Sequence, residues 1–207
     1  MKLMYEKFGQ FIDGKWQASS NKETYEVINP ANEEVIGLAS KATPEDVDRA
    51  LKSAEKGLEV WKKTSPWKRS SVIRKIADLI RAKQDVLAKW ITLEVGKPFL
   101  EGKGEVGATA DIFEWNSEET KRIYGQTVES RFEDTRIHVY YQPIGVVAAM
   151  SPWNFPLVLS GRKISTALAA GCSVIIKPDV IAPGGVMELV DICREAGVPP
   201  GVVNLLS

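Results

Sequence analysis

The chain has 207 residues, of which 44% are hydrophobic, and its 27 basic residues are balanced by 27 acidic ones. This length and apolar content suffice for a sizeable buried core, as one large domain or as one domain plus a piece of another. The balanced charge gives no strong field that would attract nucleic acid or a membrane surface. We therefore expect a small molecule or another copy of the chain as the partner.

The N-terminal residues MKLMYEK lack the apolar stretch of a secretion signal. No run reaches the ~18 apolar residues that a membrane span needs. Two cysteines, Cys172 and Cys193, are too few for a disulfide framework and lack the neighbours of a metal site. These features predict a soluble cytoplasmic protein with no metal.

The first half of the chain predicts short strands followed by helices. Residues 11–16 indicate a hairpin, with Asp-Gly suited to a type I′ turn, and residues 25–28 and 35–39 are two further extended segments. Thr43-Pro44 is typical of a helix start. The apolar residues of that helix fall on one face, namely Val47, Ala50, Leu51, Ala54, Leu58 and Trp61.

Two longer helices and a strand pair are predicted next. One helix starts at Ser65-Pro66 and runs towards Leu93, before Gly96-Lys97-Pro98. Another is expected over residues 101–124, closed by Gly125. Residues 127–141 are polar and partly alternating, which predicts a strand pair near the surface.

From Gly145 the pattern changes to short apolar strands separated by helical lengths. Strands are predicted at residues 146–150, 173–176 and 202–206, with helices at 155–170 and 185–196 between them. The first of these strands has no polar interruption, which indicates a strand covered on both faces. The β-α-β-α-β order is that of one half of a doubly wound nucleotide-binding sheet.

The predicted fold class is therefore α/β: half of a doubly wound, Rossmann-like parallel sheet, preceded by helices and an antiparallel strand pair. We divide the chain into an N-terminal part (1–126), a strand pair (127–142) and the first half of the Rossmann-like core (143–207). Three parallel strands alone would leave an apolar edge unpaired, so we expect a truncated form of a longer protein.

Two polar groups follow the first two parallel strands, at the edge where open α/β sheets bind ligands. Asn154 lies between two prolines, and is either a pre-organised amide or a plain helix cap. Lys177 could bind a ribose or a phosphate, or be a solvated strand end. Asp179 is a candidate beside it and equally a turn residue. Buried hydrophobic positions are favoured for both cysteines, and a strand position is favoured for His138, the single histidine.

Several motifs resemble the NAD(P)-dependent aldehyde dehydrogenases, and their order extends over nearly the whole chain. They are PIGVV (143–147), PWNFP (152–156), ALAAGC (167–172), KP (177–178), EAGVP (195–199), GVVN (201–204), DGKW (13–16), NPA (29–31) and EVGKP (94–98). The residues of these motifs are most similar to those of the semialdehyde-oxidising branch, such as succinate-semialdehyde dehydrogenases.

The resemblance implies a role for each edge residue. Asn154 would donate its amide to the oxyanion formed when a cysteine thiolate attacks the aldehyde. Lys177 would bind the adenosine ribose of NAD or NADP. The remaining residues would border the cofactor: Met150, Ser151, Pro152, Trp153 and Asp179.

The sequence departs from the family pattern in two respects. Val180 stands where an acidic residue commonly grips the ribose. The family's cofactor loop, general-base glutamate and nucleophilic cysteine match no residue here, so we expect the chain to be inactive alone and to form a homo-oligomer or associate with a missing C-terminal half. The rival interpretation is a non-catalytic module that binds nucleotide or associates with full-length homologues.

Overall fold

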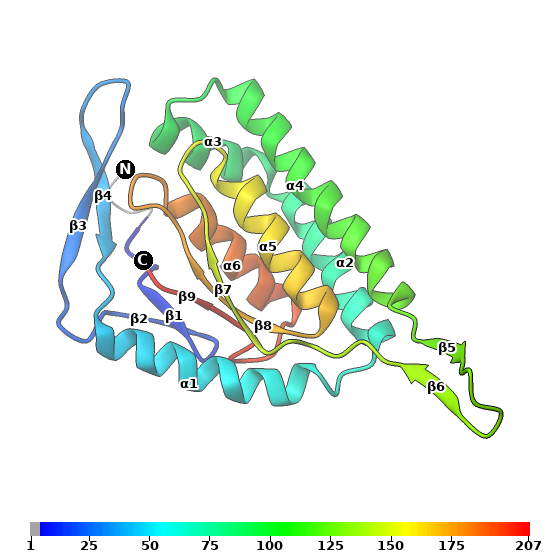
Figure 1. Ribbon diagram of the computed structural model, residues 1–207. Coiled ribbons are helices and arrows are strands. Elements are labelled where there is room, and N and C mark those ends of the chain that lie inside the picture. Colours follow the sequence, from blue (N-terminus) through cyan, green and yellow to red (C-terminus); the bar gives the residue numbers. More distant parts are fainter. Residues whose placement is uncertain (1–4) are drawn as a thin grey trace.

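In the computed structural model, which describes residues 5–207, the largest sheet has helices on both faces (Figure 1). Across these residues it contains five strands in the order β2-β1-β9-β8-β7. Helix α1 (Pro44–Trp61) lies along one face, and α5 (Pro156–Ala170) and α6 (Gly184–Ala196) cover the other. Helices α2 (Pro66–Ala82), α3 (Gln84–Val95) and α4 (Phe99–Glu119) form an outer layer over α5 and α6.

The parallel half of the sheet confirms the predicted β-α-β-α-β order. Strand β7 (Val146–Met150) pairs with β8 (Ser173–Lys177), which pairs with β9 (Val203–Leu205), all parallel. Helix α5 connects the first two strands and α6 the last two. Each helix ends at a glycine in the left-handed region, Gly171 with φ 84° and Gly197 with φ 98°.

The N-terminal hairpin completes this sheet, which the sequence did not predict. Strands β1 (Gln10–Ile12) and β2 (Lys15–Gln17) are joined by the predicted Asp13-Gly14 turn, with φ of 54° and 76° as a type I′ turn requires. Phe11 of β1 pairs antiparallel with Leu205 of β9. The expected open edge beside the third parallel strand is therefore wrong, because β1 occupies it.

Strand β7 lies at one edge of this sheet and β2 at the other. Within the described residues it pairs only with β8. Only Ala149 of its five residues is buried, and Ala148 and Met150 are exposed. Helices α1 and α5 contact β7 from the two faces of the sheet, as predicted, but its residues are less buried than expected because the strand lies at an edge.

Helix α1 begins as predicted and buries Ala50, Ala54 and Trp61 of the predicted apolar face. Thr43 and Asp46 form a capping box at its start. The predicted apolar stripe is only partly buried, since Val47 and Leu51 are exposed. The buried face includes Gly57, where an added Cβ would lie 2.2 Å from the carbonyl carbon of Gly201. The close backbone approach at Gly57 and the buried apolar residues therefore lie on the same face of this helix.

The single helix predicted from residue 65 towards residue 93 is two helices, α2 and α3. Lys83 interrupts the helix with φ −101° and ψ 20°. Its ammonium group contacts Glu188 and Glu195 of α6, at 3.4 and 2.8 Å. The following helix, α4, starts at Phe99 and gives way to a 3₁₀ turn at Thr120–Arg122, close to the predicted span.

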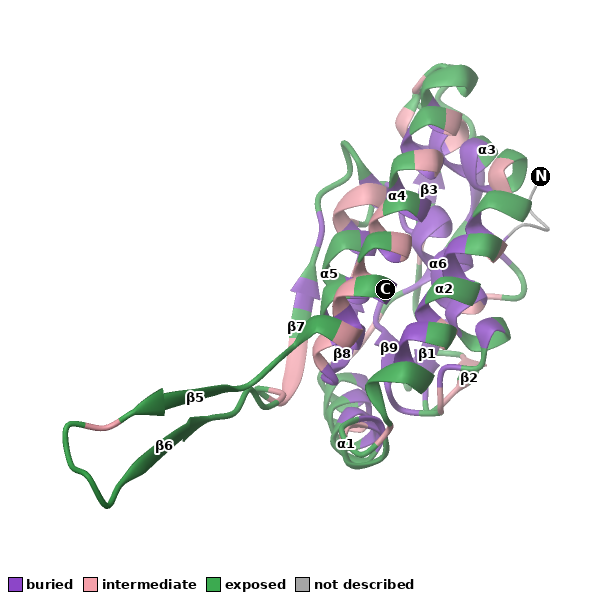
Figure 2. Cartoon of the chain, turned by 90° about the vertical axis from the view of Figure 1, so that its right-hand side faces the viewer, coloured by how far each residue is buried: buried purple, intermediate pink, exposed green. Residues whose placement is uncertain are grey.

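Two separate strand pairs complete the fold. Strands β3 (Thr24–Ile28) and β4 (Val35–Ser40) are antiparallel, as predicted. Strands β5 (Gln126–Glu129) and β6 (Arg136–Val139) form the other predicted pair, a hairpin that projects from the body with every strand residue exposed (Figure 2). His138 lies in β6, where its Nδ1 contacts the Thr127 hydroxyl at 3.2 Å.

No helix within residues 5–207 is long and apolar enough to cross a membrane.

Candidate functional site

The carboxyl edge of the parallel strands brings the predicted site residues together. Met150 at the end of β7 is in register with Lys177 at the end of β8. The Ser151 amide donates to the Lys177 carbonyl at 3.3 Å. The two segments singled out from sequence are therefore neighbours at one edge, as the strand order predicted.

The loop after β7 is fixed at its start and open at its tip. The Ser151 hydroxyl contacts the Ser160 hydroxyl of α5 at 2.7 Å, and both residues are buried. Pro152, Trp153 and Asn154 are exposed, as is the Met150 side chain before them. The segment from Met150 to Asn154 thus exposes two apolar side chains, a thioether and an indole, as well as the amide of Asn154.

Lys177 lies half-buried at this edge, and its ammonium group has unused hydrogen-bond donors. Its Nζ donates to the Pro178 carbonyl at 2.9 Å, the one hydrogen bond that it forms to residues 5–207. Burial lowers the pKa of the Lys177 ammonium, and the nearby Asp179 carboxylate partly opposes that shift. A partly desolvated cation with unused N–H groups fits a ribose hydroxyl or a phosphate.

Asp179 is held as a turn residue. Its carboxylate accepts a hydrogen bond from the Ile181 amide at 3.0 Å, and its carbonyl accepts one from Ala182 at 3.3 Å. This local bonding is the geometry of an Asx turn. Val180 beside it is 52% exposed, so a side chain at that position is free to meet a ligand at the edge.

A buried carboxylate from α4 occupies the N-terminus of α5. Glu105 Oε1 accepts hydrogen bonds from the amides of Leu157 and Val158, at 3.0 and 3.3 Å. Its Oε2 lies 2.5 Å from the Lys97 ammonium. Lys97 also donates to the carbonyl of Asn154 at 3.1 Å.

A second buried carboxylate, from α3, occupies the N-terminus of α6. The two oxygens of Glu94 accept hydrogen bonds from the amides of Gly184 and Gly185, at 2.6 and 3.2 Å. The Tyr5 hydroxyl donates to the same carboxylate. Burial raises the pKa of Glu94 to about 7, while the hydrogen bonds from Tyr5 and the two glycine amides act in the opposite direction.

Neither of these helix N-termini is free to bind an anion. Amides at a helix N-terminus are the usual phosphate ligands of nucleotide-binding sheets. Here an incoming phosphate would have to displace a buried carboxylate. The sequence indicates no role for Glu94 or Glu105, because each reaches its helix from an element distant along the chain.

The two cysteines are poorly placed to react. Cys172 precedes β8 and is 2% exposed, and Cys193 in α6 is 1% exposed. Burial raises the pKa of the Cys193 thiol to about 12. The predicted buried positions are confirmed. Within the described residues, no group of three or more His, Cys, Asp or Glu side chains is arranged to hold a metal ion.

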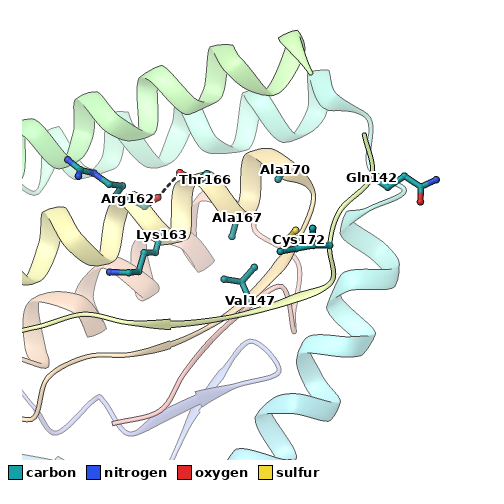
Figure 3. Close-up of a pocket in the computed structure, with 9 residues that line it drawn as sticks. Gln142, Val147, Arg162, Lys163, Thr166, Ala167, Ala170 and Cys172 are labelled. Atoms are coloured by element: carbon teal, nitrogen blue, oxygen red, sulfur yellow. Dashed lines mark hydrogen bonds between the residues drawn. The ribbon is translucent and has the colours of Figure 1, made fainter. Parts of the chain in front are cut away.

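The cavity drawn in Figure 3 lies away from this edge. It has a volume of about 410 Å³ and lies between α5 and the start of β7, near Cys172. Its lining is mostly apolar and consists of Gln142, Ile144, Val147, Arg162, Lys163, Thr166, Ala167, Ala170 and Cys172. None of the predicted site residues belongs to it, so the candidate site remains the carboxyl edge.

Comparison with known proteins agrees with the motifs of the sequence. Residues 16–207 match the family model described as "Aldehyde dehydrogenase family". The chain belongs to the aldehyde dehydrogenase family. It is 41% identical to the glutarate-semialdehyde dehydrogenase of Pseudomonas putida and 40% identical to the NADP(+) succinate-semialdehyde dehydrogenase of Escherichia coli. Each alignment covers 95% of this chain and 41% of the relative.

A solved structure shows the same fold within this family. A betaine aldehyde dehydrogenase of Staphylococcus aureus, a point mutant in complex with NAD+, superimposes with a TM-score of 0.94 and is 35% identical in sequence. The match covers 97% of this chain and 41% of that one. The chain thus spans about two fifths of the length of these aldehyde dehydrogenases.

Proposed function

We propose that this chain supplies the cofactor edge and the oxyanion-stabilising amide of an NAD(P)-dependent aldehyde dehydrogenase. The observation that carries the proposal is that the exposed Asn154 follows β7 at the ligand edge of the sheet, where Met150 lies in register with Lys177. At this edge the half-buried Lys177 ammonium, with unused donors, fits the ribose of a dinucleotide. The proposed reaction oxidises an aldehyde or semialdehyde to a carboxylic acid.

Lys177 would hold the ribose of NAD or NADP, with Met150, Ser151, Pro152 and Trp153 lining its path. The unused donors of the half-buried ammonium support that role. When bound, the cofactor accepts a hydride from the substrate. Asp179 contributes through the shape of the turn, since its carboxylate is already bonded to the Ile181 amide.

Asn154 would donate its side-chain N–H to the oxygen that becomes negative when the aldehyde carbonyl is attacked. A fixed dipole aimed at developing charge stabilises a transition state more than the ground state. The exposed Asn154 amide accepts such a ligand without losing a protein partner, since none of the described residues hydrogen-bonds to it.

The proposal is tested in a chimera that joins residues 1–207 to the remaining part of the Escherichia coli relative. We expect aldehyde-dependent cofactor reduction, with semialdehydes as the best substrates because the relatives named for semialdehydes share about two fifths of its residues. Asn154→Ala should lower kcat by about 10²- to 10³-fold. A chimera that folds and binds cofactor but never reduces it would contradict the proposed function.

We propose further that the 207-residue chain has no such activity by itself. Both of its thiols are buried, and that of Cys193 has a raised pKa, whereas the nucleophile of this chemistry must be an accessible thiolate. The measurement is cofactor absorbance with a panel of aliphatic aldehydes and semialdehydes. Turnover that disappears on replacing Cys172 or Cys193 would overturn this expectation.

Weak discrimination between NAD and NADP follows from Val180. A carboxylate beside the ribose accepts hydrogen bonds from the 2′-hydroxyl and repels a 2′-phosphate, and valine does neither. Val180→Glu in the chimera should increase the preference for NAD by about 10- to 100-fold, corresponding to roughly 1.5–3 kcal/mol. An unchanged ratio of cofactor affinities would show that the ribose is not held beside residue 180.

The second candidate function is association through the β5–β6 hairpin. Its exposed apolar side chains favour this role, namely Val128, Phe132, Ile137, Val139, Tyr140 and Tyr141. We infer a homo-oligomer or a complex with a longer relative, in the cytoplasm, with residues 127–142 as the oligomerisation unit between the parts 1–126 and 143–207. Sedimentation of the chain with and without charged substitutions at Ile137 and Val139 tests this. A monomer at all concentrations would exclude self-association.

A further inference from the structure

The loop that carries Asn154 is tied to a buried ion pair from outside the sheet. Helix α5 begins with Phe155 at its N-cap, and Phe155 offers no side-chain hydrogen bond. The first free amides of the helix, Leu157 and Val158, instead donate to Glu105 Oε1. The Glu105 side chain is 1% exposed, so this cap is shielded from solvent.

The cation of this pair reaches the candidate catalytic residue itself. Lys97 Nζ lies 2.5 Å from Glu105 Oε2, donates to the Asn154 carbonyl at 3.1 Å, and lies 3.7 Å from the centre of the Phe155 ring. Its side chain is 11% exposed. One ammonium therefore contacts the carboxylate that caps α5, the main chain of Asn154 and the next side chain.

We propose that Lys97 and Glu105 are positioning residues that set the direction of the Asn154 amide. The inference rests on the function proposed above for Asn154. Glu105 fixes where α5 begins, and Lys97 fixes the peptide that joins Asn154 to Phe155. With both ends of this short segment held, rotation about the Asn154 backbone is restricted, and its side chain projects from a fixed point.

This arrangement compensates for the exposure of the loop. Trp153, Asn154 and Phe155 are themselves exposed, so packing alone does not restrain them. A misplacement of about 1 Å can cost about 10²-fold in rate when a reaction depends on alignment. The expected effect of losing Lys97 is therefore on turnover, with little effect on cofactor affinity.

The first test uses the 207-residue chain and nuclear magnetic resonance. In Lys97→Met the ¹⁵N resonance of the Phe155 amide should shift, because the Asn154 carbonyl loses its donor, and the side-chain amide signals of Asn154 should move or broaden. Lys97→Arg should restore them in part. Lys103→Met is the matched control, since Lys103 pairs with Asp85 at 2.8 Å and faces the Phe99 ring on the same helix but is more exposed.

The second test measures kinetics in the chimera described above. Lys97→Met should lower kcat by about 10- to 100-fold with the KM for cofactor unchanged, and Lys103→Met should leave both unchanged. In an Asn154→Ala background the same Lys97→Met change should have no further effect, because a positioning residue acts only through the residue that it positions.

Specific outcomes overturn the inference. Equal losses of kcat in the presence and absence of Asn154 would show that Lys97 acts independently of it. Unchanged Asn154 signals in Lys97→Met, with unfolding shifted to lower urea, would show a purely structural ion pair. If Lys97→Met does not fold, Glu105→Gln serves in its place, because it keeps an acceptor for α5 and removes the charge. An inactive parent chimera would count against the proposed function, while the resonance data would still decide the positioning role.

Discussion

Helices α5 and α6 are capped in the same way but with different electrostatics. Each has a buried glutamate from an outer helix at its N-terminus, Glu105 for α5 and Glu94 for α6. Glu105 is paired with the ammonium of Lys97. Glu94 is bonded instead to a neutral tyrosine hydroxyl, Tyr5, and no cation lies within salt-bridge distance among residues 5–207.

The difference shows how a nearby cation changes the ionisation of a buried glutamate that caps a helix. Burial disfavours the ionised form of any carboxylate, and only a nearby cation or several hydrogen bonds can offset it. At Glu94 the hydrogen bonds offset burial incompletely, and the pKa rises to about 7. At Glu105 the carboxylate belongs to an ion pair, and removing it would leave a buried cation. The α6 cap is therefore sensitive to pH, and the α5 cap is sensitive to substitution.

The largest expected effect is that of Glu105→Ala. It leaves two helix amides without an acceptor and the Lys97 ammonium without its partner, and breaking a buried pair costs about 3–5 kcal/mol. The free energy of unfolding, measured with urea, should fall by that amount. Glu101→Ala on the exposed side of the same helix should change it little. If Glu105→Ala lowered the free energy of unfolding by less than Glu94→Ala does, the α5 cap would not be the more sensitive of the two to substitution.

The next effect is a pH dependence at the α6 cap. Because the pKa of Glu94 is raised above its unfolded value, the folded chain keeps a proton that the unfolded chain releases between about pH 4.5 and 7. The Glu94 contribution to stability is thus present below pH 4.5 and lost as the pH rises to about 7, on the order of a few kcal/mol.

The matched variant for this effect is Glu94→Gln, which cannot titrate. Unfolding free energies at several pH values between 4.5 and 7.5 should decline more steeply for the original chain than for Glu94→Gln. Parallel profiles for the original chain and Glu94→Gln would show that this carboxylate stays ionised throughout.

A smaller difference in stability is expected between alanine substitutions at two adjacent glycines of the α6 cap. A Cβ on Gly184 would lie 2.4 Å from the Trp90 ring and 2.8 Å from Glu94 Oε1, whereas one on Gly185 would make ordinary contacts at 3.6 Å and beyond. Gly184→Ala should destabilise by about 1–3 kcal/mol through overpacking. Gly185→Ala should be neutral or stabilising by up to about 1 kcal/mol, through its higher helix propensity. Thermal unfolding of both variants measures the difference, and equal melting temperatures would refute the close fit at Gly184.

Local signals explain why much of the fold was predictable. The Asp13-Gly14 turn, the Thr43 cap and the glycines that end α5 and α6 act within a few residues of chain. The site edge was predictable for a similar reason, because parallel strands place their carboxyl ends together and thus bring Met150 beside Lys177.

The features that sequence did not predict depend on distant contacts. Lys83 lies between two helices although no glycine or proline is present there. Its salt bridges to α6 cannot be predicted from the local pattern of apolar residues. Glu94 and Glu105 look like ordinary charged residues on helices, and only packing shows that they cap α6 and α5. Aldehyde chemistry, in turn, was indicated by the resemblance of motifs rather than by patterns of hydrophobicity.

The pairing of β1 with β9 has a consequence for how the chain folds. The Ser207 amide donates to Gln10 Oε1 at 2.7 Å, a contact between residues 197 positions apart. Non-local strand pairing of this kind is slow, because the ordering of the intervening chain precedes the gain from contact. During synthesis, the N-terminal hairpin emerges long before β9, so Phe11 lacks its strand partner Leu205 until residues 203–205 appear. The order of synthesis therefore leaves this molecule exposed to aggregation at its first strand.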